Sequence, residues 1–445
     1  MNLFYLRNDK SYSYLVEAIK LDLKKKYNKD VNAYYFQNPK FKLKSLLFVL
    51  KQVLILRIFD NEKIYKIEYK KIHIGQYSLA RCLRNPNSYY SKFFKILYIL
   101  NYLIKSVNLV DYSFKIVQIC DAIYIDHPMY LNGIVYSIFS KNKKIIYSNN
   151  APKGLFVIDY SLKKNSKKID IKDSLKFSKK LFFKHNDINL KKINVFFNNP
   201  KNIPWLRNTK FKKKFDLTKN LNNVEYIIYA HSFLDGVIFY GYDGFLDLRD
   251  WLEFTIEKLI KKNSKVIIKG HPNFYNNIFG EISRVDKYIF DKFISKYRNC
   301  NNLLFFNEAI NNHFFLKNFS NKKTIIISHH GSITIEASIA GFKTICSNST
   351  FWDNTFKISN QWNSRDSYNE LLRKDWNDLK NVNSKDLMTL SNQVFAEKND
   401  FGNKLWTEVI NKNLRHGNRP KNKILSKNLI SKALQKQSIN ELKFI

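Results

Sequence analysis

Cysteine is scarce in this chain of 445 residues, and its four copies are scattered along it. They are Cys82, Cys120, Cys300 and Cys346. No two of them form a C-x-x-C pair, which argues against a structural zinc site and a disulfide framework and fits a reducing compartment. No Asp-x-Asp metal motif stands out either, so we expect no metal.

Long apolar runs are also missing. The most apolar run, residues 45–59, is too short to cross a membrane and contains Lys51 and Arg57. The N-terminus does not resemble a signal peptide, because Asp9, Lys10 and Glu17 interrupt it. The sequence therefore predicts a cytoplasmic protein, either free or at the inner face of the cytoplasmic membrane.

Acidic residues are few beside basic ones. The chain has 76 Lys and Arg against 37 Asp and Glu, a formal net charge of +39, which would attract nucleic acid, anionic lipid or phosphorylated ligands. Alternatively, the positive charge reflects composition rather than a binding partner, because Lys, Asn, Ile, Tyr and Phe are all abundant, as they would be under an AT-rich genome. No RNA-binding signature, zinc-finger spacing or basic-zipper heptad is present, so we expect no specific nucleic-acid partner.

The end of the chain is especially basic. From Asn411 onward it has nine basic residues against one acid, Glu441, and Leu425, Leu429 and Leu434 give it a weak apolar face. Such a tail suits peripheral contact with an anionic membrane. The alternative is a solvated helix that packs back on the fold.

What the chain has in quantity is alternating strand and helix patterns. Apolar, β-branched runs of strand length, such as residues 225–230, 265–269 and 324–327, alternate with helical patterns such as 247–261. This alternation predicts an α/β fold with doubly wound parallel sheets. We divide the chain into a first domain at 1–160, a basic crossover linker at 161–220, a second domain at 221–400 and a basic helical tail at 401–445.

Polar side chains end or follow the predicted strands of the second domain. Because the carboxyl ends of parallel strands meet at one edge of a sheet, we expect these side chains to converge there. The clusters are His231, Asp235 and Asp243 after the first strand, Lys269, His271 and Pro272 at the second, and His329, His330, Gly331 and Ser332 at 324–327.

The segment 323–346 has the pattern strand, turn, helix, strand. We expect Ser332 to cap the helix by accepting from an early helix N–H, at an end where free amides favour an anion. Glu336 lies one turn further on the same face, where a hydroxyl such as that of ribose suits it better than a phosphate. Of the adjacent His329 and His330, one is expected to be structural, since neighbours on an extended chain point to opposite sides.

Two segments, VIIKGHPNFY and IIISHHGSITIEASIAGFKTI, resemble the capsule and surface polysaccharide biosynthesis proteins, which include Kdo-transferase-like and teichoic-acid-polymerase-like members. The segments YAHSFLDG, IHIGQYSLARCLR and IDHPMYLNGIVYSIF are looser matches. The resemblance implies the GT-B architecture, in which two facing Rossmann-like domains have a cleft between them. The N-terminal domain would then lie on the acceptor side, and the C-terminal domain would bind the nucleotide-sugar.

The resemblance also implies transfer of a sugar from a nucleotide donor to a growing glycan. In members that use CMP-linked acidic sugars, the His-Pro histidine contacts the donor phosphate, and the helix start and the glutamate bind the nucleotide. These roles fall on His271, Ser332 and Glu336. The chain departs from the family at Gly270, where many relatives have proline or another residue, and at the pair His329–His330, which leaves the donor open.

Glycosyl transfer also needs a group that takes the acceptor proton. Asp235 is our candidate, because a carboxylate in a partly dry cleft can have a raised pKa, and Asp243 is the second choice. The alternative is that Asp235 only forms a turn with Gly236. In the first domain, His73 and His127 each lie at or just after a predicted strand, and the alternative for both is an ordinary loop or core histidine.

The candidate residues fall into three groups. The expected catalytic residues are His271, Asp235 and His127. The expected donor-binding residues are Lys269, Pro272, His329, His330, Gly331, Ser332 and Glu336. The expected acceptor-binding residues are His73, His231 and Asp243.

Together these features predict a metal-independent glycosyltransferase of surface-polysaccharide assembly, with an acidic sugar such as Kdo on a CMP donor among its candidate substrates. It would need no cofactor, since the nucleotide-sugar is the substrate, and its acceptor would be a glycan or a lipid-linked glycan. Two alternatives stay open. One is a sugar-nucleotide epimerase or polyol-phosphate transferase on the same scaffold, and the other is a non-catalytic basic protein that binds membrane or nucleic acid.

Overall fold

The computed structural model describes most of both predicted domains. The described residues are 2–6, 24, 28, 30–56, 60–125, 130–142, 144–150, 156–159, 223–236, 238, 241–275, 280–350, 352 and 356–391. They group into two compact units, unit 1 with residues 2–79 and 99–159 and unit 2 with residues 80–98 and 223–391. The predicted linker at 161–220, the tail at 401–445 and His127 lie outside the described residues.

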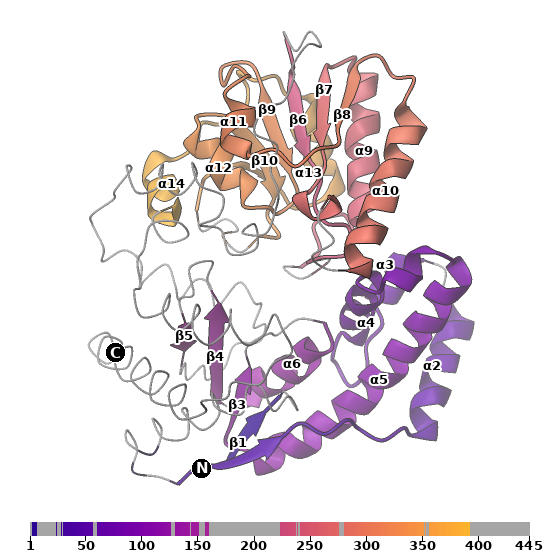
Figure 1. Ribbon diagram of the computed structural model, residues 1–445. Helices are drawn as coiled ribbons and strands as arrows, with labels where there is room; N and C mark the ends of the chain where they lie inside the picture. The colour runs from indigo at the N-terminus through magenta and orange to yellow at the C-terminus, as the bar shows by residue number, and fades with distance from the viewer. Residues whose placement is uncertain are drawn as a thin grey trace. The chain divides into compact units, whose positions relative to one another are not determined.

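Unit 1 is built on a mostly parallel sheet of order β2-β1-β3-β4-β5 (Figure 1). Its strands are β1 (Asn2–Tyr5), β2 (Asn32–Tyr35), β3 (Ala122–Ile125), β4 (Lys144–Asn150) and β5 (Phe156–Asp159). Neighbouring strands are parallel except β4 and β5. The order 2-1-3-4 of the parallel strands is that of a doubly wound sheet whose winding reverses between β1 and β3.

The helices of the first part of the chain are α2 (Leu43–Leu56), α3 (Asn61–Tyr65), α4 (Ile74–Leu83), α5 (Lys92–Ile119) and α6 (Asn132–Asn142). Among the described helices, α5 alone is long and apolar enough to cross a membrane on length and composition. A core helix passes the same test, and the burial of Leu103, Val107 and Val110 places this part of α5 in the core of unit 1. The boundary between the units falls within α4 and α5.

Unit 2 contains a parallel sheet of order β11-β10-β9-β6-β7-β8 (Figure 1). Its strands are β6 (Tyr226–Tyr229), β7 (Val266–Lys269), β8 (Leu303–Phe306), β9 (Ile325–Ser328), β10 (Lys343–Ser347) and β11 (Asn360–Trp362). Numbered from the first strand of the unit, the order is 3-2-1-4-5-6, the Rossmann arrangement. β6 pairs with β7 on one side and with β9 on the other, so the winding reverses between β6 and β9.

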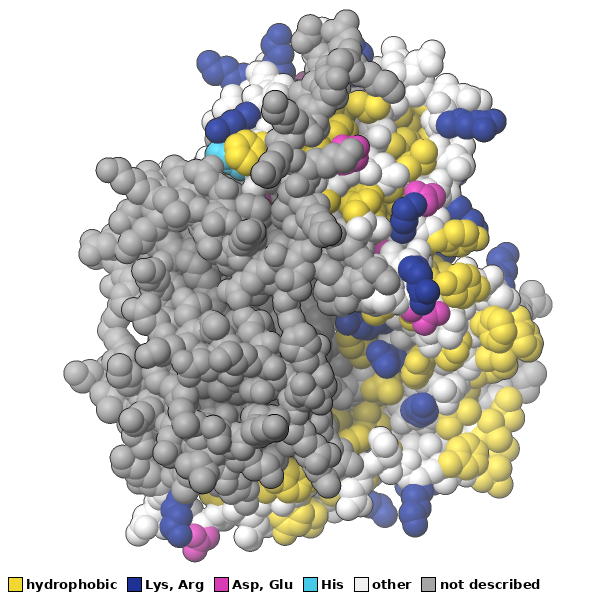
Figure 2. Space-filling model, viewed as in Figure 1, with side chains coloured by type: hydrophobic (Ala, Val, Ile, Leu, Met, Phe, Trp, Pro, Cys, Tyr) yellow, Lys and Arg dark blue, Asp and Glu magenta, His cyan; other side chains and the backbone are white. Residues whose placement is uncertain are grey.

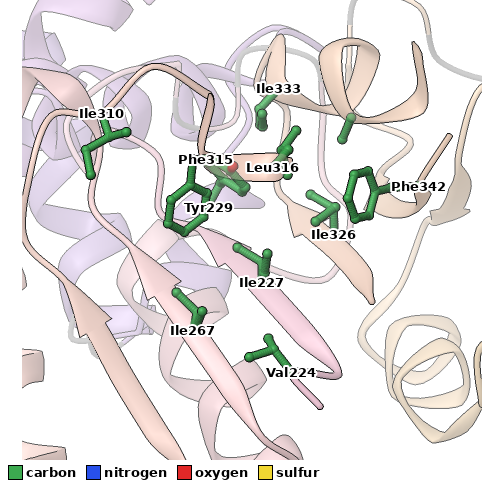
Figure 3. Packing of buried hydrophobic residues seen from close by; sticks show 11 residues of the cluster. Val224, Ile227, Tyr229, Ile267, Ile310, Phe315, Leu316, Ile326, Ile333 and Phe342 are labelled. Carbon is green, nitrogen blue, oxygen red and sulfur yellow. The ribbon is translucent and has the colours of Figure 1, made fainter. Parts of the chain in front are cut away.

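Helices cover both faces of this sheet. They are α9 (Leu248–Lys261), α10 (Glu281–Tyr297), α11 (Asn312–Leu316), α12 (Ile333–Ile339), α13 (Arg365–Arg373) and α14 (Ser384–Ser391). On one face, Ile227, Ile267 and Ile326 pack in one cluster with side chains of α11 and α12 (Figure 3). On the other face, Tyr226 receives a hydrogen bond from Lys262 at the end of α9. The alternation of side chains along each strand produces these two buried faces.

The two sheets confirm the α/β, doubly wound fold class, while the facing arrangement that the GT-B resemblance implies stays a prediction. One predicted strand is wrong. Ile72 makes only an isolated bridge with Tyr69, and α4 begins at Ile74. Lys70 and Lys71, both with positive φ, turn the chain tightly there, so His73 follows a turn rather than a strand.

Candidate active site

The candidate site lies where three neighbouring strands of unit 2 end. His231 follows β6, His271 follows β7, and His330 follows β9. These strands are adjacent in the sheet, and the gap between β6 and β9 is the point at which the winding reverses. At such a point the connections leave in opposite directions, which opens a crevice beyond the strand ends where ligands of doubly wound sheets bind.

The three imidazoles converge there. The ring centroids of His231 and His330 are 4.0 Å apart, and those of His231 and His271 are 5.5 Å apart. All three side chains are half-buried, so they are reachable from solvent and partly shielded from it. His231, which the sequence placed with the acceptor-binding residues, therefore sits with the histidines predicted for the donor side.

Two of the rings have defined proton positions. The Nδ1 of His231 lies 3.1 Å from the backbone carbonyl oxygen of Ser232. A carbonyl can only accept, so Nδ1 carries the proton and the neutral ring has its lone pair on Nε2. The Nδ1 of His271 accepts from the backbone N–H of Asn273 at 3.2 Å, so neutral His271 has its proton on Nε2. One ring thus presents an acceptor and the other a donor.

Burial keeps these imidazoles neutral. It lowers the pKa of His271 to about 3, and the nearby His231 ring and Lys269 ammonium act in the same direction while Asp235 opposes them. Burial also lowers the pKa of His231 and, well below its usual value, that of His330. At pH 7 the site therefore offers hydrogen-bonding groups without the charge of imidazolium.

His329 is held in the interior of unit 2. Its Nε2 lies 3.1 Å from Oδ2 of Asp243, and its ring meets the rings of Trp251 and Trp362 edge to face at centroid distances of 5.4 and 5.7 Å. Its Nδ1 lies 2.7 Å from the Nδ1 of His330, so one of these nitrogens donates to the other. His329 is therefore the structural member of the pair, and the line from Asp243 through His329 orients His330 toward His231.

Asp243 is a buried carboxylate, with 1 % of its surface exposed. Burial alone would raise its pKa, but pairing with His329 and the hydrogen bond from the Ser347 hydroxyl bring the pKa below the usual value. Gly244 makes the turn that follows, with φ of +104° and an added Cβ only 2.3 Å from the backbone nitrogen of Arg365. The prediction that Asp243 binds the acceptor is corrected, because a carboxylate so buried and so paired has no surface to offer.

Lys269 and Glu336 place two further charges beside the histidines. Lys269, the last residue of β7, is buried, and its ammonium lies 5.3 Å from the ring centroid of Tyr229 and 5.7 Å from that of Phe315. Burial lowers its pKa to about 8, against the attraction of Glu336. Burial raises the pKa of Glu336, and hydrogen bonds from Asn312 and Ser332 oppose this shift.

Ser332 does not cap α12 in the predicted way. Its hydroxyl donates to Oε1 of Glu336 at 3.1 Å and makes no hydrogen bond to an early helix N–H. Asn312 donates to the other oxygen of the same carboxylate at 2.9 Å. The expectation that Glu336 lies on the Ser332 face is confirmed, and the carboxylate draws the hydroxyl away from the helix end.

Asp235 differs from the expected base. Its side chain is 54 % exposed and receives a hydrogen bond from Nη1 of Arg84 at 2.6 Å. Partial loss of hydration raises the pKa of Asp235, but the His231 ring and the Arg84 guanidinium lower it below the usual value. The expectation of a raised pKa is therefore wrong, because Arg84 pairs with this carboxylate and stabilises its charged form.

The remaining predicted residues are placed as follows. Pro272 begins a short 3-10 turn, η5 (Pro272–Phe274), and His271 caps it. Gly331 lies next to the ring of His231, whose Cδ2 would be 3.9 Å from a Cβ added at Gly331. His73 belongs to unit 1, where its exposed ring lies 2.9 Å from Oε1 of Glu68, and its role stays a prediction. So does that of His127.

Three residues that hold the site side chains in place were not among those predicted from the sequence. Arg84 holds Asp235, and Asn312 holds Glu336. Asp286, on α10, accepts from the Ser232 hydroxyl at 2.5 Å and from the Leu234 N–H at 3.3 Å, and its pKa is raised by burial to about 7. Asn312 follows β8 at the same sheet edge, so the rule that found the histidines would have found it. Arg84 follows helix α4 and Asp286 lies on helix α10, so neither comes after a strand and neither had this signal.

Gly270 has a local structural reason. An added Cβ at Gly270 would lie 2.0 Å from the hydroxyl oxygen of Tyr275 and 3.0 Å from the ring of Phe290. A larger residue would push Tyr275 away from the turn that carries His271. Among the residues that the structure describes, no group of three or more His, Cys, Asp or Glu side chains could hold a metal ion.

No protein-family model and no curated protein sequence matches the chain. Among solved structures, it is similar to the KpsC beta Kdo 2,4 transferase of Thermosulfurimonas dismutans, with a TM-score of 0.35 and 10% identity over 61% of this chain and 79% of that one. It is also similar to the UDP-GlcNAc 2-epimerase of Methanocaldococcus jannaschii, with a TM-score of 0.27 and 12% identity over 88% of this chain and 98% of that one. Likeness at this level assigns no activity.

The first prediction concerns Asp243. We expect Asp243→Asn to lower the free energy of unfolding of unit 2 by about 2–4 kcal/mol, because it breaks a buried pair with His329. Chemical unfolding followed by tryptophan fluorescence measures this change. The matched control is Asp235→Asn, whose exposed pair with Arg84 is worth less than about 1 kcal/mol. Equal costs for the two substitutions would contradict the structural role of Asp243.

The second prediction concerns the protonation of His271. A histidine with a pKa near 6.5 in the unfolded chain and about 3 in the folded one costs stability as the pH falls below 6.5, because only the unfolded chain takes up the proton. His271→Asn leaves an oxygen to cap η5 and removes this titration. Between pH 8 and pH 5, the stability of the natural protein should therefore fall by about 2 kcal/mol relative to the variant. Parallel pH profiles of the unfolding free energy would show that His271 is not held neutral.

Proposed function

We propose that this chain is a metal-independent glycosyltransferase, which moves a sugar from a nucleotide donor to a surface-polysaccharide acceptor. The observation that carries the proposal is the convergence of His231, His271 and His330 where the winding of the unit 2 sheet reverses. When the sugar is transferred, the nucleotide departs with an anionic phosphate. The site must stabilise this phosphate with N–H groups and nearby positive charge, and it must limit the access of water. The three rings supply hydrogen-bonding groups, and Lys269 supplies the positive charge.

On the donor side, His271 donates from Nε2 to an oxygen of the departing phosphate. Lys269 adds a buried positive charge next to it, in surroundings where charge is weakly screened. Glu336, already bonded to Ser332 and Asn312, accepts a ribose hydroxyl of the nucleotide. When the C–O bond between the sugar and the phosphate breaks, its electron pair goes to the phosphate, which the first two residues stabilise.

On the acceptor side, His231 takes the proton of the attacking hydroxyl on Nε2, the nitrogen that holds the lone pair. The acceptor oxygen then forms the new bond to the anomeric carbon. Asp235 acts on His231 rather than on the acceptor, because its negative charge favours the imidazolium that forms. Arg84 keeps that carboxylate ionised.

The choice of donor follows the resemblance of the segments that contain His271–Pro272 and His329–Ser332, and the compartment is the one that the sequence predicts. We propose a CMP-linked acidic sugar such as Kdo as the first donor to test, with a glycan or lipid-linked glycan as acceptor and the cytoplasm as the compartment. The acceptor-binding role of His73 and the catalytic role of His127 stay predictions.

The activity is tested by incubating the full chain with CMP-, UDP- and GDP-sugars, with and without acceptor glycans. Release of nucleotide only when acceptor is present supports the transferase. Conversion of the donor without acceptor would instead indicate an epimerase. A protein that neither turns over nor is thermally stabilised by any of these nucleotides would be the non-catalytic binding protein.

The third prediction concerns the proton on Nε2 of His271. We expect His271→Ala and His271→Asn each to lower kcat/KM by about 100- to 1,000-fold, because neither side chain places an N–H at the position of Nε2, and the amide of Asn ends short of it. Asn retains the cap of η5, so the pair of variants separates catalysis from folding. Steady-state rates with the active donor measure the effect.

The control for this prediction is His313→Ala. His313 lies on α11 against Phe314 and has no part in the proposed chemistry, so its rate should equal that of the natural protein. If His271→Asn retained full activity while His271→Ala lost it, the ring would serve the turn alone and the proposed leaving-group role would be wrong.

The fourth prediction is that nucleotide binding takes up protons. A phosphate next to His271 and His330 raises their low pKa values, so affinity should rise as the pH falls from 8 to 6. Calorimetry in two buffers of different ionisation enthalpy measures the protons taken up. Because the phosphate itself titrates, the comparison is with His271→Asn, which should take up fewer protons. Equal uptake by the two proteins would contradict contact between the phosphate and His271.

A further inference from the structure

Helix α2 of unit 1 carries a row of apolar side chains on its outer surface. Leu43, Leu47 and Leu50 are 65 %, 58 % and 43 % exposed, and Phe41, just before the helix, is 63 % exposed. The spacing of four and three residues puts the leucines on one helical face. Single exposed leucines are ordinary, but an unbroken row along one face needs an explanation.

The orientation of α2 is fixed by polar contacts on its opposite face. Ser45 is buried, and its hydroxyl donates to Oδ1 of Asn108 on α5 at 2.7 Å. The ammonium of Lys44 lies 2.8 Å from Oδ2 of Asp111, a carboxylate whose side chain is almost fully buried. Turning the leucines inward would break both contacts and leave buried polar groups unpaired, which is costly. The helix thus turns Ser45 and Val49 inward and the three leucines outward.

The surroundings of the row are basic. Residues 31–59 contain five basic residues and no Asp or Glu. They are Lys40, Lys42, Lys44, Lys51 and Arg57. Of these, Lys40, Lys44 and Lys51 are exposed, and Lys44 is paired with Asp111. Figure 2 shows hydrophobic side chains gathered on the surface where α2 lies, with Lys and Arg side chains near them.

We propose that the outward face of α2 binds an anionic lipid bilayer. Leu43, Leu47 and Leu50 would enter the boundary between headgroups and acyl chains, and Lys40 and Lys51 would contact the headgroup phosphates. An apolar face next to basic residues, on a helix that lies in the plane of the interface, is the pattern of peripheral membrane binding. A bilayer matches both features, since it supplies apolar interior and negative charge along the whole helix. This proposal does not depend on the enzymatic one.

The test uses the full chain and sedimentation with vesicles. The natural protein should bind vesicles of phosphatidylglycerol and phosphatidylcholine, and bind vesicles of phosphatidylcholine alone much more weakly. The variant with Leu43→Gln, Leu47→Gln and Leu50→Gln should bind the anionic vesicles about 100-fold more weakly, through loss of apolar burial. Every basic residue is retained in this variant, so a loss separates insertion of α2 from general attraction by the net charge.

A matched control changes three exposed apolar residues of unit 2, through Leu97→Gln, Tyr288→Gln and Phe314→Gln, and should bind like the natural protein. A second variant, Lys40→Glu with Lys51→Glu, retains the leucines and should weaken binding to anionic vesicles about tenfold or more. If the leucine variant does not fold, this lysine variant still tests whether the face of α2 binds the bilayer.

Three results would overturn the proposal. One is the absence of binding to anionic vesicles, and another is equal binding by the natural protein and both α2 variants. The third is self-association of the natural protein without lipid that the leucine variant loses, because a second copy of the chain would then cover the row.

Discussion

The reversal of winding between β6 and β9 is the constraint on which the candidate site depends. β6 pairs with β7 and with β9, so three strand ends lie side by side although the strands are far apart in sequence. In doubly wound sheets, crossovers leave such a point toward opposite faces, and ligands bind beyond the strand ends there. The second residue after each of these strands is a histidine, so the order of the strands in the sheet brings the three imidazoles together.

Burial then decides what these groups can do. A half-buried imidazole is neutral because its charged form loses hydration, and the same loss lowers the pKa of Lys269 to about 8. The three rings therefore supply hydrogen-bond donors and acceptors, and the fixed charges of the site come from Lys269 and Asp235. An anion that enters changes this balance, since each ring gains more from protonation when a negative charge lies beside it. Ligand binding and proton binding are coupled for that reason.

Buried polar pairs fix orientation in both units. In unit 2, Asp243 and His329 hold His330 beside His231, and in unit 1 the bond between Ser45 and Asn108 holds the leucines of α2 outward. Neither pair is reached by solvent, so each would be expensive to leave unmade. The same physical device thus presents a polar side chain to a ligand in one unit and apolar side chains to the surface in the other.

The sequence alone determined the local elements and the edge at which chemistry would gather. Its apolar runs and helical spacing predicted β6, β7, β9, β10 and α9, and the position of His271 and His330 directly after strands placed them at one edge, because periodicity and strand ends are local properties. Only the tertiary structure decided which groups meet and how they ionise. Asp243 is buried because Ser347 and His329 pack on it from about a hundred residues away, and Asp235 is ionised because Arg84 reaches it from the turn after α4. Desolvation and pairing depend on such distant neighbours, which no short stretch of sequence contains.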